Sequence, residues 1–118
     1  MESHFLYVAS YYIKESHNVK ETSLNHYKKI GVTEDIEKRM VKLIEGGTKA
    51  PIKCQVLSAW QGPKEICVQL ENDLHNCFQH YKVNGEWFCD DDESMIPFIT
   101  REINKAIKKH NISVKKLF

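Results

Sequence analysis

A glutamate and a histidine lie four residues apart in a segment whose apolar residues recur at helical spacing. Glu71 directly follows Leu70, and His75 is at the i+4 position, so both side chains would share a helix face beside the apolar stripe. A carboxylate in that position can hold a divalent metal ion. It can also be a solvated acid paired with His75, and the spacing alone leaves both interpretations open.

Arg39 lies in another segment with helical spacing, three residues after Ile36 and four before Leu43. At such an edge its guanidinium group can present two parallel N–H groups to a phosphate. The alternative is an exposed arginine that pairs with Glu34 or Asp35. A phosphate contact and a surface ion pair are therefore the two candidates for this side chain.

Two tyrosines and two lysines fall in segments with strand-like composition. The hydroxyl group of Tyr7 or Tyr27 could hydrogen-bond a water molecule or help to deprotonate it. A strand tyrosine usually belongs to the core, however, with its hydroxyl at the rim. Strand alternation places Lys29 on the face of Tyr27 and Lys28 on the other face. Lys29 could contact phosphate or could be a solvated lysine.

Strands and helices that would position these residues alternate along the chain. Aromatic and aliphatic runs predict three strands, at residues 5–9, 27–32 and 52–60. The polar stretch 10–26 between the first two has no clean periodicity, and we expect a surface loop or a splayed hairpin arm there. A further short strand is expected at 86–88, after the Asn84-Gly85 turn signal.

Helical spacing predicts three helices. The first begins with a capping hydroxyl at Thr33 and ends at Gly46-Gly47, and the second opens at Gly62-Pro63. The last follows the acidic residues 90–93 and has a basic end, since residues 101–118 hold six Lys and Arg against one Glu. This order predicts an α+β fold, a small three-stranded mixed sheet flanked by helices, with an extra C-terminal basic helix.

Composition excludes several classes of protein. The chain has 118 residues, of which 42% are hydrophobic and 28% charged, with a formal net charge of +1. These values fit one folded domain and exclude a disordered chain. No apolar run approaches the roughly 18 residues of a membrane span, and the N-terminus has no signal-peptide pattern. We expect residues 1–92 to form the domain, and residues 93–118 to form a C-terminal helix and tail packed on it.

Cysteine usage indicates a reducing compartment. The four cysteines, Cys54, Cys67, Cys77 and Cys89, contain no C-x-x-C pair. Free buried thiols are therefore preferred over disulfides or a zinc site. The expected location is the cytoplasm, or the host cytoplasm if the source is a phage or a virus.

An ordered set of five motifs resembles the GIY-YIG nuclease superfamily. The nearest branch is the Orf172-like group, which is named for a T5-phage open reading frame and carries KIG, ExxLH and GEWF motifs. The similar segments cover roughly residues 5–90 and are Leu6-Tyr7-Val8, Lys29-Ile30-Gly31-Val32-Thr33, Arg39, Leu70-Glu71-Asn72-Asp73-Leu74-His75 and Gly85-Glu86-Trp87-Phe88. Each motif alone is weak, and their common order is the stronger signal.

The resemblance implies metal-assisted hydrolysis of a phosphodiester bond in DNA. Glu71 matches the carboxylate that holds a single divalent ion, Mg²⁺ or Mn²⁺, and Arg39 matches the arginine that contacts phosphate. Tyr7 matches the tyrosine of the first motif. Lys29 replaces the second tyrosine of the superfamily pattern, and Tyr27 on the same face could stand in for it.

Three functions are compatible with these residues. The first is a metal-dependent endonuclease with the site just described. The second is a DNA- or RNA-binding module without turnover, in which Lys28, Lys29, Arg39 and His75 contact the nucleic acid. The third is a protein-interaction domain on the same scaffold. After the fold is accounted for, little chain remains for a specificity domain, so weak sequence selectivity or a protein partner for targeting is expected.

Overall fold

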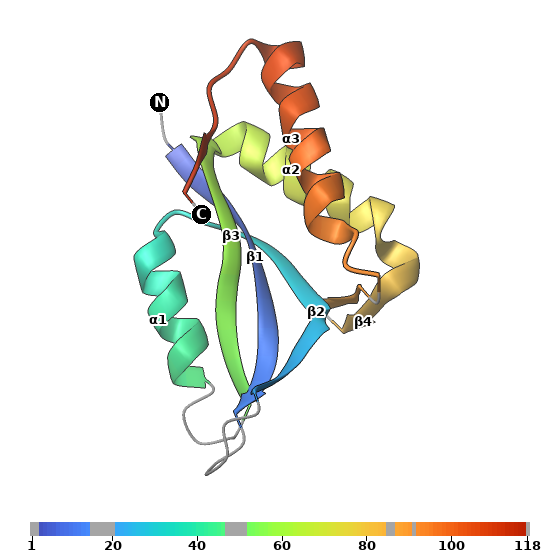
Figure 1. Cartoon of the computed structure of the whole chain (residues 1–118). Coiled ribbons are helices and arrows are strands. Elements are labelled where there is room, and N and C mark those ends of the chain that lie inside the picture. Colours follow the sequence, from blue (N-terminus) through green and yellow to red (C-terminus); the bar gives the residue numbers. More distant parts are fainter. Residues whose placement is uncertain (1–2, 15–20, 47–51, 85–86, 91, 118) are drawn as a thin grey trace.

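The structure, a computed structural model, describes residues 3–14, 21–46, 52–84, 87–90 and 92–117. Strands and helices alternate along the chain (Figure 1). In order they are β1 (Ser3–Lys14), β2 (Glu21–Thr33), α1 (Ile36–Gly46), β3 (Ile52–Pro63), α2 (Lys64–Cys77), the 3-10 helix η1 (Gln79–Tyr81), β4 (Lys82–Asn84), β5 (Trp87–Cys89), α3 (Met95–His110) and β6 (Lys115–Lys116). The α+β class is therefore confirmed.

One sheet of six strands runs through the molecule in the order β4-β5-β2-β1-β3-β6. The three predicted strands are its central members, β2, β1 and β3. The prediction of a three-stranded mixed sheet is wrong in two respects, because short strands extend both edges and every described pairing is antiparallel. Strands β4 and β6 have three and two residues, too few for any compositional signal.

The polar stretch between the first two strands is a hairpin arm rather than a surface loop. Strand β1 continues to Lys14 and β2 begins at Glu21, while residues 15–20 lie outside the described part of the chain. The β1–β2 register shifts between Ser10 and Tyr11, and the β1–β3 register shifts between Val8 and Ala9. Such irregularities break the alternation of side chains, which explains the absence of a clean period in the sequence.

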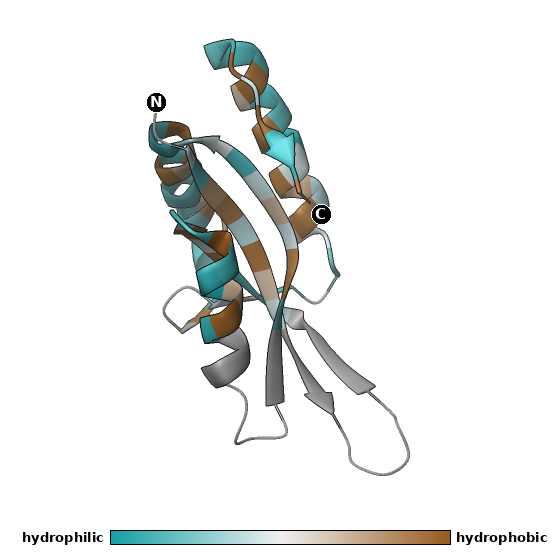
Figure 2. Ribbon diagram, turned by 90° about the vertical axis from the view of Figure 1, so that its left-hand side faces the viewer, coloured by the Kyte–Doolittle hydropathy of each residue, from teal (hydrophilic) through white to brown (hydrophobic). Residues whose placement is uncertain are grey.

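The two faces of the sheet carry separate hydrophobic clusters. The first cluster joins Leu6, Val8 and Ile30 to apolar residues of α2 and α3. The second joins Tyr7 and Ala9 to Ile36 of α1. Alternation along β1 assigns its side chains to the two clusters in turn. Figure 2 shows the matching bands of hydrophobic and hydrophilic residues along the helices and strands.

Local hydrogen bonds fix where the helices begin. The cap of α1 is Asp35 rather than Thr33, because Asp35 Oδ1 accepts the backbone N–H of Lys38 at 3.1 Å. The Thr33 hydroxyl instead bonds the backbone of Asp35. At the start of α3, Asp90 Oδ1 accepts the N–H of Met95 at 3.2 Å. Helix α2 starts one residue after Pro63.

The molecule is elongated along its three long strands, with extents of 50 × 29 × 22 Å. None of the helices in the described residues is long and apolar enough to cross a membrane. Cys67, Cys77 and Cys89 carry thiols rather than disulfides, and Cys54 lies outside the described side chains. The prediction of buried thiols holds for Cys67 but is wrong for Cys77, which is exposed.

Candidate nucleic-acid site at the edge of strand β2

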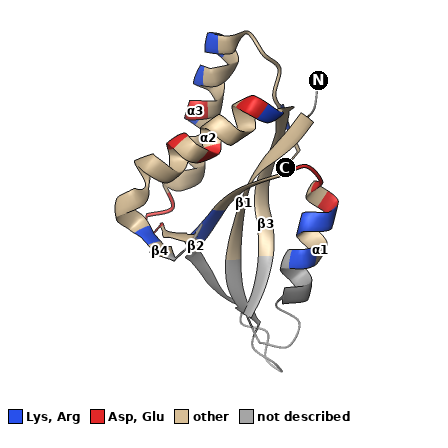
Figure 3. Cartoon of the chain, turned by 180° about the vertical axis from the view of Figure 1, so that it is seen from behind, with Lys and Arg blue, Asp and Glu red and all other residues tan. Residues whose placement is uncertain are grey.

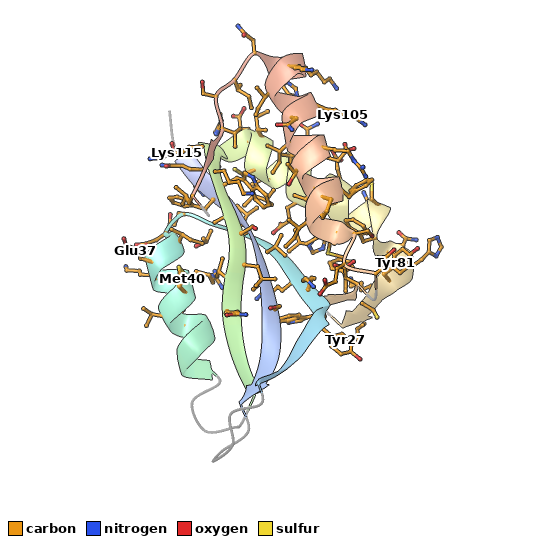
Figure 4. The ribbon with its side chains drawn as sticks, in the orientation of Figure 1. Tyr27, Glu37, Met40, Tyr81, Lys105 and Lys115 are labelled. Carbon is orange, nitrogen blue, oxygen red and sulfur yellow. The ribbon has the colours of Figure 1, made fainter. Side chains whose placement is uncertain are left out.

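Tyr7, Tyr27 and Lys29 lie on one face of the sheet. In the β1–β2 register, Tyr7 is opposite Gly31 and Ala9 is opposite Lys29. Opposed residues point to the same face, and so do residues two apart along a strand. Figure 4 shows Tyr27 beside β2, near the end of the sheet that carries β4. Tyr27 and Lys29 are half-buried, whereas Tyr7 is only 1% exposed.

The ring of Tyr7 occupies the space that a side chain at Gly31 would need. A Cβ atom built on Gly31 would lie 2.5 Å from the Tyr7 hydroxyl oxygen and 2.6 Å from Cζ. The ring therefore extends from β1 across β2, and its hydroxyl group lies over Gly31. This arrangement gives the glycine of the Lys29-Ile30-Gly31 motif a physical role, because it admits the tyrosine ring.

Arg39 lies in the first turns of α1, on the flank of the face that packs on the sheet. It lines a cavity of about 250 Å³ together with Val32 and Thr33 from the end of β2 and with Lys38 and Lys42 from α1. Glu34 and Asp35, its predicted alternative partners, line the same cavity. Three basic side chains and two acidic ones therefore line this hollow, and the balance of one positive charge favours an anion such as phosphate.

Two hydrogen bonds hold α2 against the sheet, one to β1 and one to β2. Near the start of the helix, the Cys67 thiol donates to the carbonyl oxygen of His4 at a distance of 3.6 Å. Near its end, His75 Nε2 lies 3.0 Å from the carbonyl oxygen of Ile30. Glu71 lies midway between these two residues in the helix, one turn before His75. Its half-buried carboxylate shares the helix flank of His75, which faces the β2 edge.

His75 joins α2 to strand β2 through a hydrogen bond. Since a carbonyl oxygen only accepts hydrogen bonds, Nε2 carries the proton and donates it to Ile30. The ring also packs edge-on against Phe88, with centroids 5.0 Å apart. A contact between His75 and nucleic acid stays a prediction.

Lys28 and Lys29 have different environments although they are neighbours. Lys28 points into the opposite face, is 3% exposed, and forms an ion pair with Asp90 at 3.6 Å. A phosphate contact by Lys28 stays a prediction that requires this buried pair to open. Burial raises the pKa of Asp90, and the charge of Lys28 opposes that rise. Sequence analysis missed this pairing, because an acidic run reads as solvated surface.

Trp87 and Phe88 of β5 face opposite sides of the sheet. Phe88 is fully buried in the cluster under α2 and α3. Trp87 is half-buried, pairs in register with Lys29, and packs against the cluster that contains Tyr7. The two aromatic residues therefore have different roles, one in the core and one on the face of the site.

The charged residues of the site come from three elements. Figure 3 shows basic residues on α1 and β2 and acidic residues on α2, which supply Arg39, Lys29 and Glu71 respectively. The cavity places Arg39 beside residues 32 and 33 of β2, and the bond from His75 to Ile30 joins α2 to the same strand. We call this region the β2-edge site; it comprises Tyr7, Lys29, Arg39 and Glu71.

Comparisons with known proteins give one match. Neither the search of curated proteins nor the search of solved structures found a match. A family model, the T5orf172 domain, matches residues 4–111, which includes the β2-edge site and all three helices. Because the match covers more than half of its length, the chain belongs to the T5orf172 domain family.

Proposed function

We propose that the protein is a metal-dependent endonuclease that hydrolyses phosphodiester bonds in DNA at the β2-edge site. The T5orf172 family is one of nuclease and DNA-binding domains, which supports action on DNA. The observation that carries the proposal is the cavity that Arg39 lines at the end of β2, beside Val32 and Thr33. Glu71 would approach this strand from the other face of the sheet, since it lies on α2, which the bond from His75 to Ile30 joins to β2. The hydroxyl of Tyr7 lies over the same strand.

The donor set fits Mg²⁺ or Mn²⁺ held largely by water and phosphate. The described side chains contain no group of three or more His, Cys, Asp or Glu residues that could form a protein cage. Mg²⁺ commonly binds through one or two carboxylates, with water and substrate phosphate completing its octahedron. Glu71 would hold the ion, which would supply positive charge to the phosphate and the leaving oxygen when bound.

The remaining residues would bind the phosphate and orient water. Arg39 would present its guanidinium fork to the non-bridging oxygens, with Lys38 and Lys42 adding positive charge around the same cavity. Tyr7 would hydrogen-bond the attacking water. Lys29, or Tyr27 two residues earlier on the same face, would complete the orientation of that water.

The test is cleavage of supercoiled plasmid and of single-stranded DNA with Mg²⁺ or Mn²⁺. Glu71→Gln keeps the shape of the side chain and removes its charge, so we expect cleavage to fall by about 100-fold or more. Glu65→Gln is the matched control, because Glu65 is an exposed carboxylate in the first turn of the same helix. If neither metal supports cleavage above the level of Glu71→Gln, the nuclease proposal is wrong.

A DNA- or RNA-binding module without turnover is the second candidate. The near-complete burial of Tyr7 favours it, because water must reach the hydroxyl for catalysis. This alternative predicts salt-sensitive nucleic-acid binding that Arg39→Gln weakens, with no strand cleavage under any metal condition.

A further inference from the structure

Trp87 lies on the face of the sheet that carries Tyr7 and Lys29 of the β2-edge site. It pairs with Lys29 across β5 and β2, whereas its neighbour Phe88 pairs with Lys28 and is fully buried on the other face. Alternation therefore points the indole ring to the face of Lys29 and Tyr7. Its half-buried state distinguishes it from Trp60, which is 3% exposed in the core.

The Trp87 side chain lies against the apolar cluster on this face of the sheet. Trp87 packs against the cluster whose sheet members include Tyr7 and Ala9 of β1. Strand β2 lies between β5 and β1, and neighbouring strands are about 4.8 Å apart. Because the Tyr7 ring extends from β1 over Gly31 of β2, Trp87 on β5 can contact this cluster above β2. Since Trp87 is only half-buried, part of the ring remains open to solvent.

A flat aromatic ring beside a phosphate site can bind the base of a nucleotide. Every nucleobase has a π face, and an exposed aromatic side chain can stack on a base that has left its own stack. Lys29, the register partner of Trp87, can contact the phosphate of the same nucleotide. A fully paired duplex does not offer such a base, because its bases are already stacked on one another.

We infer that Trp87 is a stacking platform for an unpaired nucleobase beside the β2-edge site, and that the substrate is single-stranded or locally unpaired DNA. This inference rests on the proposed function and names its substrate class. The ring would hold the base while Lys29 and Arg39 hold the backbone.

The experiment measures binding of the full chain to labelled oligo(dT), to a blunt duplex of equal length and to oligo(U), with EDTA present to prevent cleavage. We expect oligo(dT) to bind more tightly than the duplex. Trp87→Leu keeps apolar packing on Tyr7 and loses the π face, so it should weaken oligo(dT) binding by about 5- to 150-fold, the range of one stacked base. Duplex binding should stay unchanged.

Two further variants separate stacking from misfolding. Trp87→Phe retains a ring, so it should recover part of the oligo(dT) affinity, and it leaves Trp60 as the only tryptophan. DNA should therefore quench the tryptophan fluorescence of the wild type but not that of Trp87→Phe. Tyr81→Leu is the matched control, because Tyr81 is 58% exposed and lies in η1, after the end of α2 (Figure 4). It should leave binding unchanged.

Each outcome bears on one proposal. Equal affinity of Trp87→Leu and wild type for oligo(dT), no fluorescence quenching, or no DNA binding at all would overturn the stacking inference. Tighter binding of oligo(U) than of oligo(dT) would overturn DNA as the substrate. If Trp87 variants lose binding as expected but the wild type never cleaves, the inference stands and the nuclease function fails. If the wild type cleaves DNA and Trp87→Leu leaves that cleavage unchanged, the nuclease function stands and the stacking inference fails.

Discussion

At the scale of single residues, the contact between Gly31 and Tyr7 is the most restrictive feature of the site. The structure records no positive φ angle for Gly31, so the need for glycine comes from space and not from backbone conformation. Tyr7 is 1% exposed, and the ring has little room to withdraw. The position of the Tyr7 hydroxyl thus depends on position 31 carrying a hydrogen atom in place of a side chain.

Gly31→Ala should displace the Tyr7 ring. We expect a loss of about 1–3 kcal/mol in the free energy of unfolding, the usual cost of overpacking a filled core, together with lower cleavage. Gly62→Ala is the control, because the nearest atom to its Cβ would be a methyl carbon of Val114 at 3.3 Å, with the other Val114 methyl and Cys67 Sγ at 3.9 Å. It should cost less than about 1 kcal/mol. Urea unfolding measures both, and equal losses in the two variants would contradict the steric argument.

At the scale of elements, the buried pair of Lys28 and Asp90 joins β2 to the start of α3. Asp90 accepts the backbone N–H of Met95 through Oδ1 and faces Lys28 through Oδ2, at 3.6 Å. Within the described structure, neither Lys28 Nζ nor Asp90 Oδ2 has a hydrogen bond. Each charge therefore depends on the other for compensation.

Lys28→Met should leave Asp90 buried without its cation. We expect a loss of about 3–5 kcal/mol in unfolding free energy at pH 7. Because burial already raises the pKa of Asp90 and Lys28 opposes the rise, the variant raises it further. The pKa of Asp90 is then higher in the folded state than its ordinary value of 3.8 in the unfolded chain. The folded state therefore loses stability as the pH rises from 3.8 through the pKa of Asp90 in the folded state. The deficit should therefore shrink as the pH is lowered.

The double variant Lys28→Met, Asp90→Asn tests the pairing directly. Asparagine keeps an oxygen for the Met95 N–H and carries no charge, so the double variant should recover most of the stability at pH 7. Lys105→Met is the surface control. Its partner Glu102 is 3.2 Å away but the lysine is 75% exposed, so the loss should stay below about 1 kcal/mol. If the loss of unfolding free energy in the double variant equals the sum of the losses in the two single variants, Lys28 and Asp90 are not coupled.

The elements differ in how far the sequence predicts them. The three central strands follow from their aromatic and aliphatic residues, and the helices follow from apolar spacing. Strand β6 cannot be predicted, because Lys115 and Lys116 have no strand-like pattern and are ordered by pairing with Trp60 and Gln61 of β3. The antiparallel direction of β3 to β1 likewise depends on the path of the chain around α1.

The candidate site was predictable as a set of motifs but not as a geometry. Glu71 and Arg39 are singled out by their order with other motifs, and the sequence does not indicate that Arg39 lines a cavity at the end of β2. The burial of Lys28 was not predictable either, since two adjacent strand lysines look alike. Only the partner Asp90, far along the chain, distinguishes one from the other.

At the scale of the whole molecule, a formal net charge of +1 conceals separated charges. Basic residues lie around the cavity at the start of α1 and at the end of α3, and acidic residues lie on α2. Local positive potential attracts phosphate even where the total charge is near zero. A near-neutral protein can therefore bind DNA through one surface.

Binding of DNA should weaken steeply with salt in spite of the near-neutral charge. The double variant Lys38→Gln, Lys42→Gln removes two exposed cations around the Arg39 cavity, so the slope of log affinity against log salt should become shallower by about one unit per lysine. Lys105→Gln is the control, because Lys105 lies on α3 and pairs with Glu102. An unchanged slope in the double variant would exclude phosphate binding at this cavity.

The overlap of Tyr7 with Gly31 also limits the routes by which the protein can evolve. A larger residue at position 31 is compatible with the fold only after the residue at position 7 has become smaller, so the order of two mutations matters. A smaller residue at position 7 removes the hydroxyl group, however, and with it the proposed contact to water. Lineages that gain a side chain at position 31 would therefore pass through an inactive nuclease, and the pair should be inherited as a unit wherever cleavage is retained.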